Sequence, residues 1–246
     1  MKTIAVVPAR GGSQGIKRKN LQMLGSSCLL EWTITAALDS GIYDEVVVST
    51  DCLDIAEIAR SSGALVPFIR DASLAHSRAL AVPTIKDAVV RTEYELGCAF
   101  DVVHMLQPTS PFRDISDFKA INDFFTKPDS SICSVISVVG VGNTHPMKMK
   151  LVNDAGLMED YCPSPQENMP RQDLPPVFIV NGCFYAVKRD TLVNKNTFKG
   201  GLVQPYVMPY TRSMNIDTLS DLFQARQWVQ LFDLQPGQIP EEFRWP

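Results

Sequence analysis

The sequence predicts a single α/β domain, residues 1–246, built on a mostly parallel β-sheet with helices on both faces. Short apolar runs alternate along the chain with segments whose apolar residues recur at helical spacing. The runs are apolar throughout instead of alternating with polar residues, which is typical of strands buried on both faces. Glycines that favour helix termination stand just past the first three helical segments, at Gly41, Gly63 and Gly97.

The expected elements follow in chain order. Strands are expected at residues 4–7, 45–49, 64–67, 101–106, 132–138 and 183–187. Helices are expected around residues 30–38 and 55–59, over about 82–96 and 115–125, and from near Thr218 onward. Because connections between parallel strands are right-handed, the carboxyl ends of these strands meet at one edge of the sheet, where open α/β sheets bind ligands.

The pattern breaks from about residue 140 to residue 178, where the chain is rich in Pro, Asn, Gly and Met. The prolines of this excursion exclude a long helix. Two short extended pieces, 147–152 and 156–159, flank residues 153–155 and predict a hairpin. An irregular excursion of this length inside a compact domain is usually functional, as a lid or an oligomer contact.

Composition narrows the class of protein. Hydrophobic residues make up 45% of the chain and charged residues 20%, as in an ordinary soluble globular protein. The net charge of −4 argues against a general nucleic-acid-binding surface, and no apolar run approaches the length of a membrane span. The first residues enter a strand without the pattern of a signal peptide, so we expect a cytoplasmic protein with no nucleic-acid or membrane partner. The six scattered cysteines predict neither a disulfide framework nor a zinc site, and His104, inside an apolar strand, is expected to be a core residue.

A glycine-rich loop follows the first strand, with Arg10 at its start and three consecutive cations, 17–19, at its end. Backbone N–H groups surrounded by positive charge suit a polyphosphate. Residues 11–15 match neither the G-x-G-x-x-G dinucleotide fingerprint nor the G-x-x-x-x-G-K-[ST] phosphate loop, because Ile16 occupies the second glycine position of the latter. The loop therefore predicts a phosphate site of another type, and a dinucleotide oxidoreductase is disfavoured.

Residues 8–21 read Pro-Ala-Arg-Gly-Gly-Ser-x-Gly-Ile-x-x-Lys-Asn-Leu, and they resemble the signature of the CMP-sialic acid synthetases, the acylneuraminate cytidylyltransferases. The resemblance covers nearly the whole chain and returns, in order, at residues 47–51, 106–113, 171–175, 181–182 and 216–218. It implies a Rossmann-like nucleotidyltransferase fold similar to that of glycosyltransferase-A enzymes. It also implies a homodimer in which the excursion, about residues 140–178, reaches over the partner's active site.

The same resemblance implies an enzyme that transfers CMP from CTP to the anomeric hydroxyl of an acidic nonulosonic sugar and releases pyrophosphate. Arg10 and Lys19 would hold the triphosphate and stabilise the departing pyrophosphate, assisted by loop N–H groups around Gly12 and Ser13. Asn20 would hydrogen-bond the nucleotide near its ribose, although a helix or turn cap is the alternative for an asparagine there.

The cytosine base would lie near Arg70, where an arginine can both hydrogen-bond a carbonyl and stack, the alternative being a surface arginine. Backbone groups around Ala81 would complete the contacts with the base. Residues 76–81 differ from the acidic, Ser/Thr-containing stretch that is usual in the family, a change that backbone contacts would tolerate.

The acceptor sugar would be bound by polar residues from three later segments. Ser110 would complete the CTP site, while Gln107 and Thr109, in the same proline-braced loop, would face the sugar or the nucleotide. Arg171 would approach the sugar carboxylate or the phosphates, and Asn181 would hydrogen-bond the sugar.

Asp217 is the candidate ligand for Mg²⁺ or Mn²⁺, since a metal ion that bridges a carboxylate to triphosphate oxygens suits this chemistry. The alternative for Asp217 is a helix N-cap. Asn215 is a possible second ligand, but it stands where the family usually has the first of two aspartates, so the metal site has one fewer charge. No nucleophile–base pair is evident, and the sequence predicts direct in-line displacement.

Two further departures concern the substrates. Gln14 stands where the family usually has a lysine, which removes one phosphate-binding cation unless Lys17 or Arg18 compensates. Ile179 stands where sialic-acid-specific members carry an arginine, which points to another nonulosonic acid such as legionaminic acid. The remaining alternatives are a cytidylyltransferase for 3-deoxy-manno-octulosonate, pseudaminate or a phosphonate, and a catalytically weakened nucleotide-binding protein.

Overall fold

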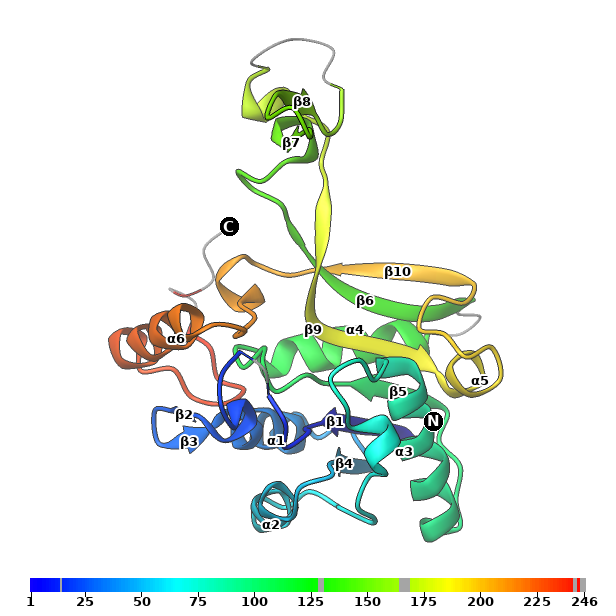
Figure 1. Ribbon diagram of the computed structural model, residues 1–246. Coiled ribbons are helices and arrows are strands. Elements are labelled where there is room, and N and C mark those ends of the chain that lie inside the picture. The colour runs from blue at the N-terminus through cyan, green and yellow to red at the C-terminus, as the bar shows by residue number, and fades with distance from the viewer. Residues whose placement is uncertain (14, 128–130, 164–168, 241–242, 244–246) are drawn as a thin grey trace.

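The computed structural model describes residues 1–13, 15–127, 131–163, 169–240 and 243, and its centre is a six-stranded sheet in the order β10-β6-β9-β5-β1-β4 (Figure 1). Strand β9 runs antiparallel to β5 and β6, and every other neighbouring pair is parallel, so the predicted mostly parallel sheet is confirmed. The strands of this sheet are β1 (Thr3–Pro8), β4 (Glu45–Ser49), β5 (Val102–Met105), β6 (Ile132–Gly140), β9 (Phe178–Lys188) and β10 (Leu202–Val207).

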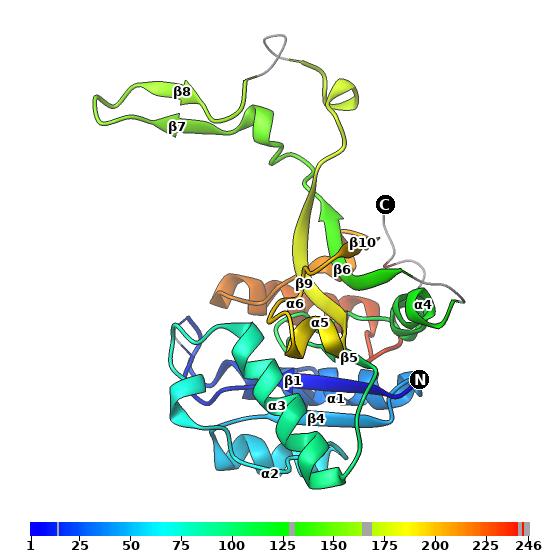
Figure 2. The same cartoon turned by 90° about the vertical axis from the view of Figure 1, so that its right-hand side faces the viewer.

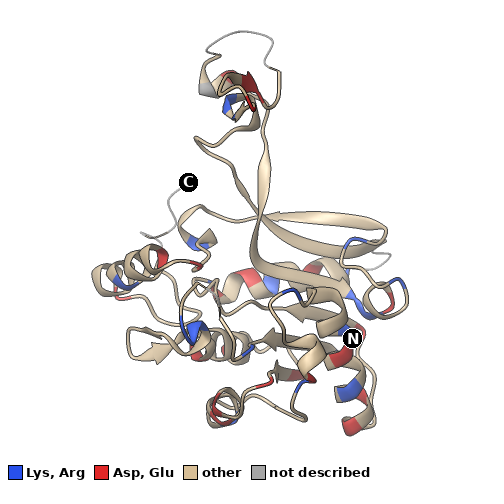
Figure 3. Ribbon diagram, in the orientation of Figure 1, with Lys and Arg blue, Asp and Glu red and all other residues tan. Residues whose placement is uncertain are grey.

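Helices cover both faces of the sheet, as the apolar strands predicted. Alternate residues of β1 enter different cores: Ala5 and Val7 pack with α1, α2 and α4, whereas Ile4 and Val6 pack with α3 and α5. The ribbon of the central sheet is almost entirely without charge, while lysines, arginines and carboxylates gather on the surrounding helices and loops (Figure 3). The helices are α1 (Leu29–Ser40), α2 (Leu53–Ser61), α3 (Ala81–Leu96), α4 (Ile115–Thr126), α5 (Arg189–Val193) and α6 (Leu219–Phe232).

Two sequence predictions differ from the structure at prolines. The strand expected at 64–67 is reduced to a single bridge between Leu65 and Val47, because Pro67 has no N–H with which to continue the ladder. Strand β10 was not predicted, and it contains Pro205, which is tolerated there because β10 lies at the edge of the sheet.

An arm, described over residues 141–163 and 169–177, stands clear of the sheet, beyond the ends of β6 and β9 (Figures 1 and 2). It carries the expected hairpin, formed by β7 (Lys150–Val152) and β8 (Met158–Asp160). Five of its apolar side chains are exposed by 50–75% of their surface: Leu151, Val152, Leu157, Met158 and Tyr161. Exposed apolar groups gathered on one projecting segment are typical of a surface that contacts another protein.

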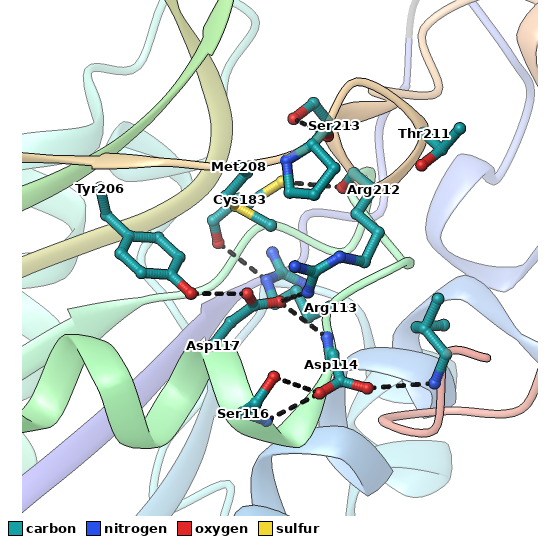
Figure 4. A network of polar contacts seen from close by, with 12 residues as sticks. Arg113, Asp114, Ser116, Asp117, Cys183, Tyr206, Met208, Thr211, Arg212 and Ser213 are labelled. Atoms are coloured by element: carbon teal, nitrogen blue, oxygen red, sulfur yellow. Dashed lines mark hydrogen bonds and ion pairs between the residues drawn. The ribbon is translucent and has the colours of Figure 1, made fainter. Parts of the chain in front are cut away.

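A buried polar network joins the start of α4 to strands β9 and β10 (Figure 4). Asp117 is fully buried and accepts hydrogen bonds from the Tyr206 hydroxyl at 2.8 Å and the Asp114 backbone N–H at 2.9 Å, and it pairs with Arg212. Burial, together with the charge of Asp117, raises the pKa of the Tyr206 hydroxyl. Arg113, beside Asp117, donates to the backbone oxygens of Cys183 and Gln107 at 2.8 and 2.7 Å. The network therefore fixes the backbone at Gln107, where the site described below begins.

His104 is a fully buried core residue on β5, as predicted, with its Nδ1 2.8 Å from the Tyr43 hydroxyl. Burial lowers the pKa of its imidazole from 6.5 to about 3. Below pH 6.5 the unfolded chain takes up a proton that the native protein does not, so stability decreases as the pH falls toward 3. This residue alone is expected to lower the free energy of unfolding by about 2 kcal/mol between pH 7.5 and pH 5.

Denaturant unfolding of the native protein and of His104→Gln at both pH values measures this difference. The variant should lose about 2 kcal/mol of the pH dependence, since glutamine does not titrate. An equal pH dependence in both proteins would show that the acid sensitivity comes from other groups.

No helix in the described part of the chain has the length and apolar character needed to span a membrane. All six cysteines are free thiols, as predicted.

Candidate active site

A cavity of about 500 Å³ opens at the carboxyl ends of β1 and β5, the edge at which the topology predicted a ligand site. Four segments meet there: the glycine loop after β1, the connection between α2 and α3, the loop after β5, and the residues before α6. The lining residues are Pro8, Arg10, Ser13, Gly15, Lys19, Asn20, Arg70, Leu74, His76, Ser77, Ala79, Ala81, Thr84, Met105, Gln107, Pro108, Thr109 and Asp217.

The structure brings most of the sequence-predicted residues into this one cavity. Those among its lining are Arg10, Ser13, Lys19, Asn20, Arg70, Ala81, Gln107, Thr109 and Asp217. The remaining predicted residues do not line the cavity: Gly12, Ser110, Asn181 and Asn215. Arg171 begins a 3₁₀ turn (Arg171–Asp173) in the arm, and neither its side chain nor Gln14 belongs to the described part of the structure.

The glycine loop is held in place by its own polar contacts. Arg10 donates through Nη1 to the backbone oxygen of His76 at 2.8 Å, which fixes the guanidinium at the cavity. Asn20 is buried, and its amide donates to the backbone oxygen of Arg10 at 3.0 Å. Asp51, after β4, accepts from the Gly11 N–H at 2.9 Å. Asn20 thus braces the loop instead of capping a helix, while still lining the cavity.

The cations of the loop divide into two groups. Lys19 lines the cavity, whereas Lys17 and Arg18 do not. Arg18 adopts a left-handed backbone conformation and forms an ion pair with Asp54 of α2. Neither Lys17 nor Arg18 therefore adds a second lysine or arginine of this part of the loop to the cavity.

Arg70 also lines the cavity. Only 5% of its surface is exposed, which rules out the surface-arginine alternative. Its Nε donates to the Ser49 hydroxyl at 2.9 Å, and its Nη2 donates to the Ser49 backbone oxygen. Burial lowers the pKa of the guanidinium; the charges of Asp51 and Asp87 oppose this shift, and the charge of Arg10 adds to it. Ala81, the first residue of α3, and Thr84 in the first turn of the same helix also line the cavity.

Asp217 faces the cavity because another residue caps the helix. The Thr218 hydroxyl accepts from the Asp221 N–H, and the Asp221 side chain accepts from the N–H groups of Thr218 and Asp217 at 2.8 and 3.0 Å. The Asp217 carboxylate pairs with Lys19 at 2.7 Å and accepts from the Asn215 amide. Thr218, and not Asp217, is thus the N-cap of α6.

At two glycines the backbone lies so close to a residue of the cavity that a larger side chain would not fit: Gly15 lies against Asp217, and Gly182 lies against Gln107. A Cβ on Gly15 would lie 2.6 Å from the backbone oxygen of Asp217, so only glycine lets the loop reach that residue. Gly182 has φ +79°, and a Cβ there would lie 2.7 Å from Gln107 Oε1. Gly182 therefore backs the Gln107 side chain directly.

Ser110 and Asn181 are turned into the protein. Ser110 is fully buried. Asn181 accepts from the Ser137 hydroxyl at 2.6 Å and donates to the Ser213 hydroxyl at 2.9 Å. Conversely, His76 and Ser77 line the cavity although no role was predicted for their side chains; the only signal was the departure of residues 76–81 from the family pattern.

Comparisons with known proteins show which family and which fold this chain shares. A family model described as cytidylyltransferase matches residues 4–152. A CMP-N,N'-diacetyllegionaminic acid synthase from Legionella pneumophila is 31% identical over 94% of this chain and 97% of its own length. An N-acylneuraminate cytidylyltransferase from Streptococcus agalactiae is 30% identical over 90% of this chain. The match covers only 52% of the length of that relative. A solved structure titled CMP:2-keto-3-deoxy-manno-octonic acid synthetase complexed with CTP shares the fold, with a TM-score of 0.67 at 17% identity over 95% of this chain and 100% of its own.

Proposed function

Because the chain belongs to the cytidylyltransferase family, and so is an enzyme of the nucleotidyltransferase type, we propose that it transfers CMP from CTP to the anomeric hydroxyl of a nonulosonic acid. The observation that carries the proposal is the meeting of Arg10, Lys19, Arg70 and Asp217 in one cavity at the carboxyl ends of the strands. The named activities of the relatives support a nonulosonic acceptor, and Ile179 favours legionaminic acid over N-acetylneuraminic acid.

The triphosphate binds between the glycine loop and Asp217, and the base binds between Arg70 and the start of α3 at Ala81. The sugar hydroxyl attacks the α-phosphorus and loses its proton to solvent. A new oxygen–phosphorus bond forms, and the bond to the bridging oxygen of pyrophosphate breaks. Negative charge gathers on the departing pyrophosphate, where Arg10 and Lys19 stabilise it. Gln107 and Thr109 orient the sugar at the neighbouring wall.

Asp217 would hold Mg²⁺ or Mn²⁺, with the Asn215 amide oxygen as a possible second donor. Within the described residues no group of three or more His, Cys, Asp or Glu could hold a metal ion. One carboxylate together with substrate phosphates nevertheless fits Mg²⁺, which keeps several waters and takes hard oxygen ligands. When bound, the ion would neutralise charge on the phosphates.

The proposal is tested by measuring pyrophosphate release from CTP and Mg²⁺ with a panel of acceptors. The panel contains legionaminic, N-acetylneuraminic and pseudaminic acids, 3-deoxy-manno-octulosonate and a phosphonate. Turnover with a nonulosonic acid is expected. Turnover only with the octulosonate or the phosphonate would assign another acceptor, and CTP binding in a calorimeter without turnover on any acceptor would contradict the proposal.

Substitution at Gly182 tests the sugar wall. Gly182→Ala is expected to lower the free energy of unfolding by about 1–3 kcal/mol, because alanine is strained at φ +79° and displaces Gln107. The KM for the sugar should rise more than the KM for CTP, which steady-state kinetics measure. Gly41→Ala is the matched control, since Gly41 has φ +67° with nothing within 4 Å of a Cβ. The stability of Gly41→Ala should fall while both KM values stay those of the native protein. If the KM for the sugar were also unchanged in Gly182→Ala, Gln107 would not contact the sugar.

We further propose that the arm forms a homodimer contact with a second copy of the chain. Its exposed apolar side chains supply one surface. A groove of about 860 Å³ at the root of the arm, lined in part by Phe178, Val207 and Tyr210, supplies a second. Sedimentation should show a dimer for the native chain and a monomer for Val152→Asp. Leu231→Asp, at an exposed side chain of α6, should leave the dimer intact. A native monomer, or a dimer in both variants, would contradict this contact.

A further inference from the structure

Both oxygens of the Asp217 carboxylate are engaged by the chain itself. Oδ1 accepts from Lys19 Nζ at 2.7 Å, and Oδ2 accepts from the side-chain amide of Asn215. The backbone at Asp217 is fixed in turn by the carboxylate of Asp221. A divalent cation bound to Asp217 would therefore lie next to the ammonium group of Lys19. The two positive charges would repel each other at such a short separation.

Lys19 has a second partner within reach, since it lines the same cavity as Arg10 and Ser13. The Asp217 side chain is 61% exposed, and ion pairs with so exposed a partner are weak. A nucleotide triphosphate carries several negative charges and would compete with a single carboxylate for Lys19. Movement of Lys19 onto the phosphates would free Oδ1 and at the same time place phosphate oxygens beside it.

We propose that Lys19 and Asn215 make Asp217 a conditional metal ligand, which accepts a divalent cation only after a nucleotide triphosphate has drawn Lys19 away. The inference rests on the proposed function in that the nucleotide is CTP. In the free protein the ammonium of Lys19 takes the place of the cation at the carboxylate. Nucleotide therefore binds before the metal, and the metal alone does not load the site.

Titration of the nucleotide-free protein with Mn²⁺, followed by the electron paramagnetic resonance signal of free Mn²⁺, tests the role of Lys19. Lys19→Met should bind Mn²⁺ at least about tenfold more tightly than the native protein, the effect expected from removing one charge next to the ion. Lys17→Met removes the same charge from the same loop but outside the cavity, and should bind Mn²⁺ as the native protein does. Equal Mn²⁺ affinity in all three proteins would overturn the inference.

A second variant keeps the test independent of the folding of Lys19→Met. Asn215→Asp adds a carboxylate and removes the amide donor to Asp217, so it should also bind Mn²⁺ more tightly without nucleotide. Unchanged Mn²⁺ affinity in this variant, verified as folded by circular dichroism, would count against the inference.

Calorimetry of CTP binding separates the order of binding from the function itself. The native protein in EDTA should bind CTP. Binding of CTP only when Mg²⁺ is present would overturn the proposed order but leave the cytidylyltransferase function standing. Absence of CTP binding with and without Mg²⁺ would instead contradict the proposed function.

Discussion

Replacing Arg10 with alanine is expected to lower kcat/KM for CTP by about 10³-fold, the effect of removing a principal cation from a phosphoryl-transfer site. Arg10 lines the cavity, and its guanidinium is fixed by the 2.8 Å hydrogen bond to the His76 backbone oxygen. A group held in advance needs no reorganisation when charge develops on the departing pyrophosphate, so its loss should lower the rate of the chemical step. Pyrophosphate release at varied CTP concentration measures the effect.

Arg18→Ala provides the matched control for this prediction. Arg18 belongs to the same loop and carries the same charge, but it is exposed and pairs with Asp54 outside the cavity. Its removal should change kcat/KM by no more than about twofold, since exposed ion pairs contribute little. Similar losses in both variants would mean that the net charge of the loop, rather than the position of Arg10, determines the rate.

Asp117→Ala is expected to lower the free energy of unfolding by about 3–5 kcal/mol, because it leaves the buried Arg212 without its carboxylate partner. The Tyr206 hydroxyl and the Asp114 N–H lose an acceptor in the same change. Urea unfolding monitored by circular dichroism measures the loss.

Asp123→Ala, on the exposed face of the same helix, is the control for Asp117→Ala. A surface substitution of this kind should change the free energy of unfolding by no more than about 0.5 kcal/mol. Comparable destabilisation in the two variants would show that losing any aspartate of α4 has this effect and that the buried network contributes no additional stability.

The sequence was sufficient to predict the parallel sheet, the helices on its faces and the edge at which the cavity opens, because these follow from local periodicity and the handedness of connections. It could not predict the extent of pairing at Pro67 and Pro205, since the same residue ends one strand and is tolerated in another that lies at an edge.

The direction of side chains at the site was harder to predict. Arg18 and Lys19 are adjacent in the sequence, yet one pairs with Asp54 on α2 and the other with Asp217, 198 residues away. Asn181 is part of a motif that suggested sugar binding, but partners from β6 and the 3₁₀ turn Thr211–Ser213 hold its amide inside the protein. Such choices depend on contacts between distant segments, which a single sequence does not display.

The two ends of the arm are direct neighbours in the sheet, where Gly140 of β6 pairs with Phe178 of β9. In topological terms the whole arm is an enlarged connection between two adjacent antiparallel strands, and a short turn could close the same pair. The entropic cost of such a connection grows only slowly with its length. Insertions, deletions or exchange of the arm between relatives can therefore alter what it contacts while the register of the sheet, and the cavity at its edge, stay the same.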